Sequence, residues 1–318
     1  MLLRKEKIKM EKTTLYTIPS LYRDDFCIQG YTFGKGEKSL CILGSMRGNE
    51  YQQIYTCSRL VQVLKKMEEE GRIVSGKEIL VVPSLNPCSM NIGKRFWSTD
   101  NTDINRMFPG YNLGETTQRI AAGIFDVVSE YKNGIQFASF YMPGRFSLHV
   151  RIMKTGFEEV EKGRTFGLPY IVLRTPRPYD TTTLNYNWQI WETDAYSLYT
   201  TTTDQIDEES SQSMMSAILR FMNVNEMINY PTDQPSWSTV FRDEELVSVR
   251  PKNSGIFRSK KSVGESVKKG EVIAWVLDAC EGKVIEQLAA STDEKIFFAF
   301  DQPLVYANTA AVKILPDE

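Results

Sequence analysis

The segment 44–53, GSMRGNEYQQ, contains the residues of this chain that come closest to a metal-binding motif. It follows an apolar run, 39–44, and leads into a helix that we expect to start near Glu50. The order His-x-x-Glu at such a strand–helix junction commonly holds zinc through two side chains. We interpret Met46 as the residue in the first ligand position, which leaves Glu50 as the one ligand of the pair.

The histidine count limits the metal chemistry further. The chain has one histidine, His149, whereas catalytic zinc normally takes three protein ligands. A site of two histidines and one carboxylate is therefore excluded. The five cysteines, at positions 27, 41, 57, 88 and 280, lack paired spacing, so we expect buried free thiols. A part for Cys88 or His149 in a rebuilt site stays open.

Alternating strand and helix patterns precede and follow this segment. Short apolar runs at 39–44 and 78–83 are typical of buried parallel strands, and the residues between them have helical spacing that ends near Gly71. A second helix is predicted within 114–131. Further strands are expected in three segments, 134–142, 169–175 and 188–196. The alternation predicts an α/β sandwich with a parallel or mixed sheet.

The pattern changes at the proline-containing junction 231–237. Beyond it, short apolar segments are separated by glycine turns, which predicts a small all-β module. We therefore expect an α/β domain over 1–235 and a β-barrel-like domain over 236–318. The run Val263–Ile273 resembles half of a biotinyl or lipoyl barrel, but Lys283 lies off the tip of the expected hairpin, so a packing role is favoured over a carrier role.

Composition excludes several classes of function. Hydrophobic residues make up 42% and charged residues 25% of the chain, and the net charge is −2. This balance disfavours binding to nucleic acid or to a membrane surface. No apolar run approaches the roughly 20 residues of a membrane helix. The start, residues 1–12, is charged throughout, so we expect a cytoplasmic protein.

Several segments in order resemble the succinylglutamate desuccinylase/aspartoacylase family of the zinc carboxypeptidase superfamily. GSMRGNE is similar to the family's G-x-H-G-N-E, and the segment 81–110, which ends in DINRMFPG, is similar to its D-x-N-R-x-F-P-G signature. The resemblance covers nearly the whole chain. It implies a carboxypeptidase-like three-layer sandwich with a mixed sheet, followed by a small all-β C-terminal module.

The resemblance also implies a metal site in altered form. The family's three ligands correspond to Met46, Glu50 and Phe140, and Ala138 corresponds to an aspartate that orients the second histidine. A thioether suits copper(I) better than zinc, and a phenyl ring donates no lone pair. We therefore expect a vestigial site without a metal cofactor, in which Met46 and Phe140 fill the space of the ion.

Other family residues are present. Arg95, Asn105 and Arg106 correspond to residues that bind the substrate carboxylate and polarise the scissile carbonyl. The planar fork of an arginine suits a carboxylate. Glu192 corresponds to the catalytic general base, which in the family activates a metal-bound water. Structural roles, as a loop staple for Asn105 and Arg106 and as a buried carboxylate for Glu192, remain alternatives.

Three hypotheses of function follow. The first is a non-catalytic family member that binds an acyl-amino acid or a peptide C-terminus, or that accompanies a homologous active subunit. The second is an amide hydrolase with an unconventional metal site, or with metal-free chemistry based on Glu192 and Arg95. The third is a scaffold or partner protein whose C-terminal module provides the interaction surface.

Overall fold

A computed structural model describes residues 10–22 and 24–316 of the chain. The residues divide into two compact units. The first unit comprises the chain up to Ala138 together with His149–Thr239, and the second comprises Ser139–Leu148 together with the chain from Val240 onward. The charged segment 1–9, which contributed to the expected cellular location, lies outside the described residues.

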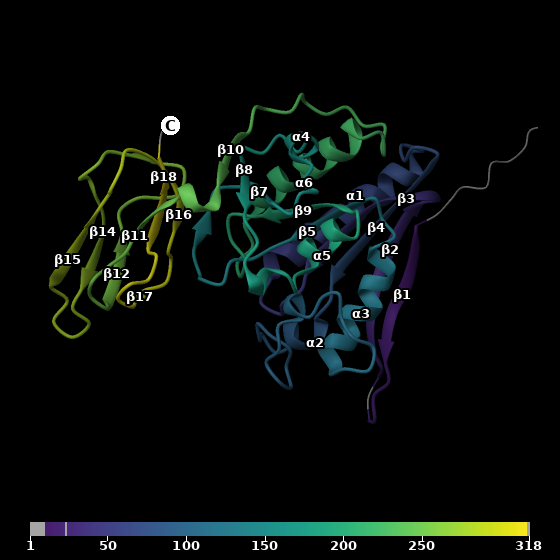
Figure 1. Cartoon of the computed structure of the whole chain (residues 1–318), viewed down its shortest axis with the longest axis horizontal. Helices are drawn as coiled ribbons and strands as arrows, with labels where there is room; N and C mark the ends of the chain where they lie inside the picture. The colour runs from purple at the N-terminus through teal and green to yellow at the C-terminus, as the bar shows by residue number, and fades with distance from the viewer. Residues whose placement is uncertain (1–9, 23, 317–318) are drawn as a thin grey trace, which may run out of the picture. The chain divides into compact units, whose positions relative to one another are not determined.

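A mixed sheet of nine strands forms the centre of the first unit (Figure 1), in the order β1-β2-β4-β3-β5-β9-β7-β8-β10. Its strands are β1 (Glu11–Ile18), β2 (Phe26–Gly34), β3 (Gly36–Ser45), β4 (Gly76–Ser84), β5 (Asn133–Phe137), β7 (His149–Met153), β8 (Tyr170–Arg174), β9 (Asp194–Tyr199) and the edge strand β10 (Thr239–Arg242), of which only Thr239 belongs to the first unit. Strands β4, β3, β5 and β9 run parallel to one another. Strand β7 is antiparallel to β9 and parallel to β8.

Helices cover both faces of this sheet. They are α1 (Tyr51–Glu69), α2 (Pro87–Met90), α3 (Thr116–Val128), α4 (Val160–Arg164), α5 (Leu184–Ile190) and α6 (Glu208–Val224), with short 3-10 turns η1 (Ile104–Arg106) and η2 (Pro178–Asp180). Cys41 and Leu43 of β3 pack in one core with α3 and α5. Because side chains alternate along a strand, Leu40 and Ile42 face the opposite side of the sheet, which α1 covers.

The predicted α/β class with a mixed sheet is confirmed, and so are its first elements. The apolar run 39–44 lies in β3, the run 78–83 lies in β4, and the helical pattern between them forms α1. The strand expected over 188–196 was wrong in its first half. Residues up to Ile190 belong to α5, a turn follows, and β9 begins only at Asp194.

The second unit consists of antiparallel sheets, as expected for the C-terminal β module. One contains β11 (Val247–Val249), β18 (Val312–Leu315), β16 (Glu294–Ala299) and β13 (Ser266–Val267), with β6 (Arg145–Phe146) paired to β16. The other contains β15 (Val284–Ala289), β14 (Val272–Leu277), β12 (Gly255–Ser259) and β17 (Leu304–Val305). The remaining turn, η3 (Asp243–Glu245), precedes β11.

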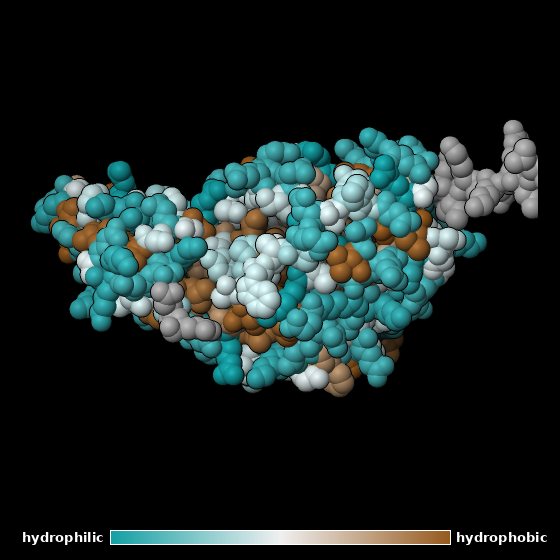
Figure 2. All heavy atoms as spheres, turned by 90° about the horizontal axis from the view of Figure 1, so that it is seen from above, coloured by the Kyte–Doolittle hydropathy of each residue, from teal (hydrophilic) through white to brown (hydrophobic). Residues whose placement is uncertain are grey.

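The face of the molecule seen in Figure 2 is mostly polar. Figure 2 shows hydrophilic residues over most of the viewed face, with small hydrophobic patches between them. Scattered apolar residues on a surface are normal for globular proteins. Among the described residues, no helix has the length and apolar character needed to cross a bilayer.

Candidate functional site

The candidate site lies where β3 ends and α1 begins. The Glu50 side chain is fully buried at this junction. Its Oε2 accepts hydrogen bonds from the backbone N–H groups of Met46, at 2.8 Å, and of Arg47, at 3.0 Å. The tight turn after β3 therefore aims two amide dipoles at one carboxylate oxygen, which stabilises its negative charge.

The other oxygen of Glu50 contacts an arginine. Arg47 Nη1 lies 3.0 Å from Glu50 Oε1, while its Nε and Nη2 donate to Asp103 Oδ2 at 3.2 and 2.8 Å. Arg47 is 6% exposed. Burial opposes its charged form, but the charges of Glu50 and Asp103 outweigh burial and raise the pKa of Arg47 above its ordinary value. One guanidinium thus joins two carboxylates from distant parts of the sequence.

The assignment of Met46 to the first ligand position needs correction. A His-x-x-Glu motif separates its ligands by two residues, so the residue that precedes Glu50 at this spacing is Arg47. The structure agrees, because Arg47 reaches the Glu50 carboxylate through its side chain. The Met46 side chain packs in the core with α3 and α5, where its Sδ lies 3.6 Å from Gln136 Nε2. Sequence reasoning missed Arg47, although counting residues back from Glu50 would have identified it.

Asp103 is a second site residue that sequence reasoning missed. It caps η1, because its Oδ1 accepts from the backbone N–H of Asn105 at 3.1 Å, while its Oδ2 binds Arg47. The DINR segment contained the signal, since an aspartate side chain often accepts a hydrogen bond from the backbone N–H two residues further on. This cap and the Arg47 ion pair fix the segment that carries Asn105 and Arg106.

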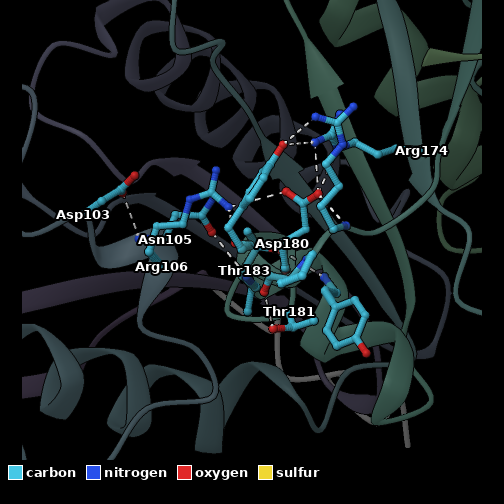
Figure 3. A network of polar contacts seen from close by, with 12 residues as sticks. Asp103, Asn105, Arg106, Arg174, Asp180, Thr181 and Thr183 are labelled. Carbon is cyan, nitrogen blue, oxygen red and sulfur yellow. Dashed lines mark hydrogen bonds and ion pairs between the residues drawn. The ribbon is translucent and has the colours of Figure 1, made fainter. Parts of the chain in front are cut away.

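Asn105 and Arg106 hold the loop that leads into α5 (Figure 3). Asn105 is 8% exposed, and its Oδ1 accepts from the backbone N–H of Leu184 at 3.2 Å. Arg106 Nη1 donates to the Tyr179 carbonyl at 2.6 Å and lies 3.5 Å from Asp180 Oδ1. These contacts agree with the staple role, while the Arg106 side chain keeps 38% of its surface exposed.

Asp180 is the centre of this second polar network. Its Oδ2 accepts from Arg174 Nε at 3.1 Å and Nη2 at 3.0 Å, and from the backbone N–H of Arg177 at 3.0 Å. Figure 3 shows Arg106 and Arg174 reaching this carboxylate from different elements. Arg174 binds Asp180 through two donors, whereas Arg106 contacts it through one nitrogen. The Arg106 guanidinium therefore has more N–H groups available for a ligand.

Arg95 lies in the field of the Arg47 group. Its backbone carbonyl accepts from the Gly48 N–H at 3.0 Å, and its side chain is partly buried. Burial lowers the pKa of Arg95, and the nearby Arg47 charge lowers it further, whereas Glu50 and Asp103 oppose the shift. Arg95 therefore lies near enough to Arg47 and Glu50 for their charges to act on its guanidinium.

Glu192 lies elsewhere, and its prediction as a general base beside Glu50 needs correction. It is exposed in the turn between α5 and β9, with a φ of 66°. This turn precedes the start of β9, which is in register through β5 with Leu40 in the middle of β3, whereas Glu50 follows the end of β3. The two positions are roughly 20 Å apart along the strands. The chain that follows β9 at the Glu50 edge carries Thr200–Thr203, and the Thr203 carbonyl accepts from the Gln52 N–H at 3.1 Å.

Phe140 belongs to the second unit. Its ring packs at 5.2 Å from the Phe146 ring and at 5.9 Å from the Phe298 ring. Ala138 is the last residue of the first unit before this segment, and its carbonyl accepts a hydrogen bond from Gln53 Nε2 at 3.4 Å. The pairing of Phe140 with Met46 across one vacated cavity stays a prediction.

The remaining candidates offer little chemistry. His149 is fully buried at the start of β7, and its ring stacks on Tyr199 at 4.5 Å. Burial raises the pKa of the Cys41 and Cys57 thiols well above the ordinary range, which disfavours the nucleophilic thiolate. Cys88 is partly buried beside the α3 core. Within residues 10–22 and 24–316, no three His, Cys, Asp or Glu side chains form a group that could hold a metal ion.

The sheet, its helices and the appended β module define a carboxypeptidase-like α/β protein. A family model, the succinylglutamate desuccinylase/aspartoacylase catalytic domain, matches residues 36–133. An N-alpha-acetyl-L-2,4-diaminobutyric acid deacetylase of Halomonas elongata is 23% identical over 275 residues, which are 77% of this chain and 72% of that protein. Residues 36–133 therefore match the catalytic domain of the succinylglutamate desuccinylase/aspartoacylase family, and the Halomonas elongata relative supports the same family over most of the chain.

Solved structures share the fold over almost the whole chain. A succinylglutamate desuccinylase from Silicibacter sp. TM1040 has a TM-score of 0.83 at 16% identity, with 98% of this chain and 96% of that chain covered. The product-bound ectoine utilization protein EutE from Ruegeria pomeroyi has a TM-score of 0.79 at 16% identity, with the same coverage. At this level of identity, the likeness establishes the fold. The family itself is one of amide-cleaving deacylases.

Proposed function

We propose that this protein is a non-catalytic member of its family that binds the carboxylate of an N-acyl amino acid or of a peptide C-terminus. The observation that carries the proposal is the contact of 3.0 Å between the buried guanidinium of Arg47 and the Glu50 carboxylate. The guanidinium supplies at Glu50 the positive charge that a metal ion supplies in a zinc hydrolase. Hydrolysis by that route needs a metal ion to lower the pKa of a bound water.

The donor set around Glu50 does not fit a zinc ion. Glu50 Oε2 already accepts two backbone N–H groups, and Oε1 faces Arg47. A divalent cation at this position would lie beside a buried guanidinium of the same sign, which is strongly unfavourable at such a distance. The exposed position of Glu192 also removes the candidate general base from this edge.

Arg95 and Arg106 support the binding half of the proposal. Arg47 and Arg95 repel each other, and burial disfavours the charged form of Arg95, so an incoming anion would relieve both effects. Arg106 keeps an exposed guanidinium surface beside η2. A ligand carboxylate can accept paired hydrogen bonds from an arginine fork of this kind.

The alternative is an amide hydrolase with an unconventional site, which the activities in the names of the relatives favour. Metal analysis and an amine-release assay separate the two. Protein purified without chelator should contain far less than one equivalent of zinc. After zinc is added, the protein should still release no amine by cleaving the amide of N-alpha-acetyl-L-2,4-diaminobutyrate. Stoichiometric zinc, or turnover that a chelator abolishes, would overturn the non-catalytic reading.

Ligand binding is tested separately by calorimetry and thermal shift with N-succinyl-L-glutamate. A ligand that binds only the folded protein raises its melting temperature. We expect Arg106→Ala to weaken binding at least tenfold with little change in the melting temperature of the free protein, because Arg174 still pairs with Asp180. The control is Arg59→Ala, which removes an exposed arginine of α1 that pairs with Glu208. Equal affinity in Arg106→Ala and wild type would contradict the carboxylate site.

A further inference from the structure

The ring of Tyr179 is surrounded by arginine side chains at the surface of the first unit. Tyr179 is 51% exposed, and its ring centroid lies 5.6 Å from Arg106 Cζ and 6.0 Å from Arg174 Cζ. Its hydroxyl oxygen accepts hydrogen bonds from Arg174 Nη2 at 3.2 Å and from Arg177 Nη1 at 3.1 Å. Three guanidinium groups, from η1, from β8 and from the residue before η2, therefore meet at one aromatic side chain (Figure 3).

Arg177 brings a positive charge to the surface beside this ring. Its side chain is exposed, and within the described residues it forms no ion pair with a carboxylate. The nearby carboxylate of Asp180 accepts from the backbone N–H of Arg177 at 3.0 Å, whereas the guanidinium groups that contact it belong to Arg174 and Arg106. The charge of the Arg177 guanidinium is therefore available to an anion from solution.

The Tyr179 hydroxyl is a second donor at the same place. A phenolic hydroxyl has one hydrogen to donate and can accept two hydrogen bonds. Arg174 and Arg177 supply both of the accepted bonds, and no side chain or backbone group in the described part of the chain accepts the hydroxyl hydrogen. That hydrogen is therefore available to an external acceptor. The other N–H groups of Arg177 can reach the same acceptor, because Arg177 Nη1 already contacts the hydroxyl oxygen.

The backbone around these donors is fixed before any ligand binds. Asp180 Oδ2 accepts from Arg174 through two nitrogens and from the Arg177 backbone N–H, which caps η2. Thr181 Oγ1 donates to the Pro178 carbonyl at 2.7 Å and closes the same turn. Because the turn is ordered in advance, binding has to order little more than the Arg177 side chain.

We propose that Arg177 and the Tyr179 hydroxyl, with Arg174 behind them, bind the dianionic phosphate group of a small phosphomonoester. The three terminal oxygens of this group point in different directions, so two can accept from the arginine fork while the third accepts from the hydroxyl. A carboxylate has only two oxygens in one plane and carries half the charge. The site goes beyond the carboxylate function proposed above, because it requires neither Arg95 nor Arg106.

Two matched phosphate compounds test the site on the wild-type chain. Calorimetry at pH 7 compares glycerol 3-phosphate, a monoester that is mostly a dianion there, with dimethyl phosphate, a diester with one charge and two terminal oxygens. We expect the monoester to bind about tenfold more tightly. Its affinity should fall at pH 5, because the phosphate takes up a proton near pH 6 while arginine stays charged. Equal affinities, or no binding of glycerol 3-phosphate, would overturn the inference.

Two variants test the donors themselves. Arg177→Gln keeps the backbone N–H that Asp180 accepts, and Tyr179→Phe removes only the hydroxyl, so each should weaken the binding of glycerol 3-phosphate about tenfold. The control is Arg258→Gln, which removes an exposed arginine of β12 in the second unit and should leave the affinity unchanged. An equal loss in the control and in Arg177→Gln would mean that the phosphate responds only to net charge, and the inference would fail. If a variant does not fold, the comparison of the two compounds on wild type still decides.

Discussion

The buried guanidinium of Arg47 depends on both neighbouring carboxylates to compensate its charge. Arg47 has the Glu50 and Asp103 carboxylates within 3.0 Å, and removing one partner of such a group leaves an uncompensated charge out of water. The group joins the β3–α1 turn to η1, which are 56 residues apart. It therefore holds together the segment that carries Glu50 and the segment that carries Asn105 and Arg106.

Arg47→Ala should destabilise the protein by about 3–5 kcal/mol, because the buried Glu50 and the partly buried Asp103 would lose their shared cation. Urea unfolding followed by circular dichroism measures the change. Arg59→Ala provides the matched control, since its partner Glu208 is exposed, and it should have little effect. A loss in Arg47→Ala no larger than in this control would mean that the buried ion pairs do not stabilise the fold.

At the scale of elements, one acidic residue links the beginnings of three neighbouring strands. Glu37 of β3 contacts Lys77 of β4 at 2.6 Å and Lys132, just before β5, at 2.8 Å. Hydrogen bonds from Lys132 and then Lys77 lower the pKa of Glu37 from 4.5 to about 2. The folded state therefore favours the ionised carboxylate.

Glu37→Gln tests this link through pH. A depressed pKa contributes stability above the unfolded value of 4.5, and that stability is lost as the pH falls from 4.5 toward about 2. Wild type should melt at a higher temperature than Glu37→Gln at pH 7, and the difference should disappear over that acidic range. Because the group is at the surface, 1 M salt should also reduce the difference. A difference independent of pH would rule out the charge as its cause.

At the scale of the molecule, the second unit takes a segment from the middle of the first. Residues 139–148 belong to it together with the chain from Val240 onward. Within that unit, Phe146 of β6 pairs with Phe298 of β16, and the Phe140 ring packs on both. A chain cut after Thr239 would retain 139–148 but would lose the strand that covers its aromatic residues.

The fragment 10–239 should therefore self-associate, because Phe140 and Phe146 would be exposed to solvent. Size-exclusion chromatography with light scattering measures its mass. The same fragment with Phe140→Ser and Phe146→Ser is the control, and it should be closer to a monomer. If both fragments have the same mass, these two side chains do not cause the association.

Local periodicity was enough to predict β3, β4 and α1, because buried parallel strands and a two-faced helix each have a characteristic spacing of apolar residues. Motif resemblance was enough to predict the similarity to this family, whereas the roles that it implies for Glu50, Asn105 and Arg106 stay predictions. Periodicity failed to predict the structure of the segment 188–196, because a short apolar run is compatible with a helix and with a strand. Packing of Trp188 on Gly134 makes its first part helical and leaves Glu192 in an exposed turn.

The role of Arg47 depends on the folded chain, because its partner Asp103 lies 56 residues away and no local pattern pairs them. The same holds for Gln136, Asn185 and Gln189, which are polar residues in segments that read as apolar core. Their burial follows from the placement of α5 on the sheet, a contact between segments that are distant in sequence. Residue types and spacing specify the elements, whereas long-range packing determines which charged and polar side chains become buried.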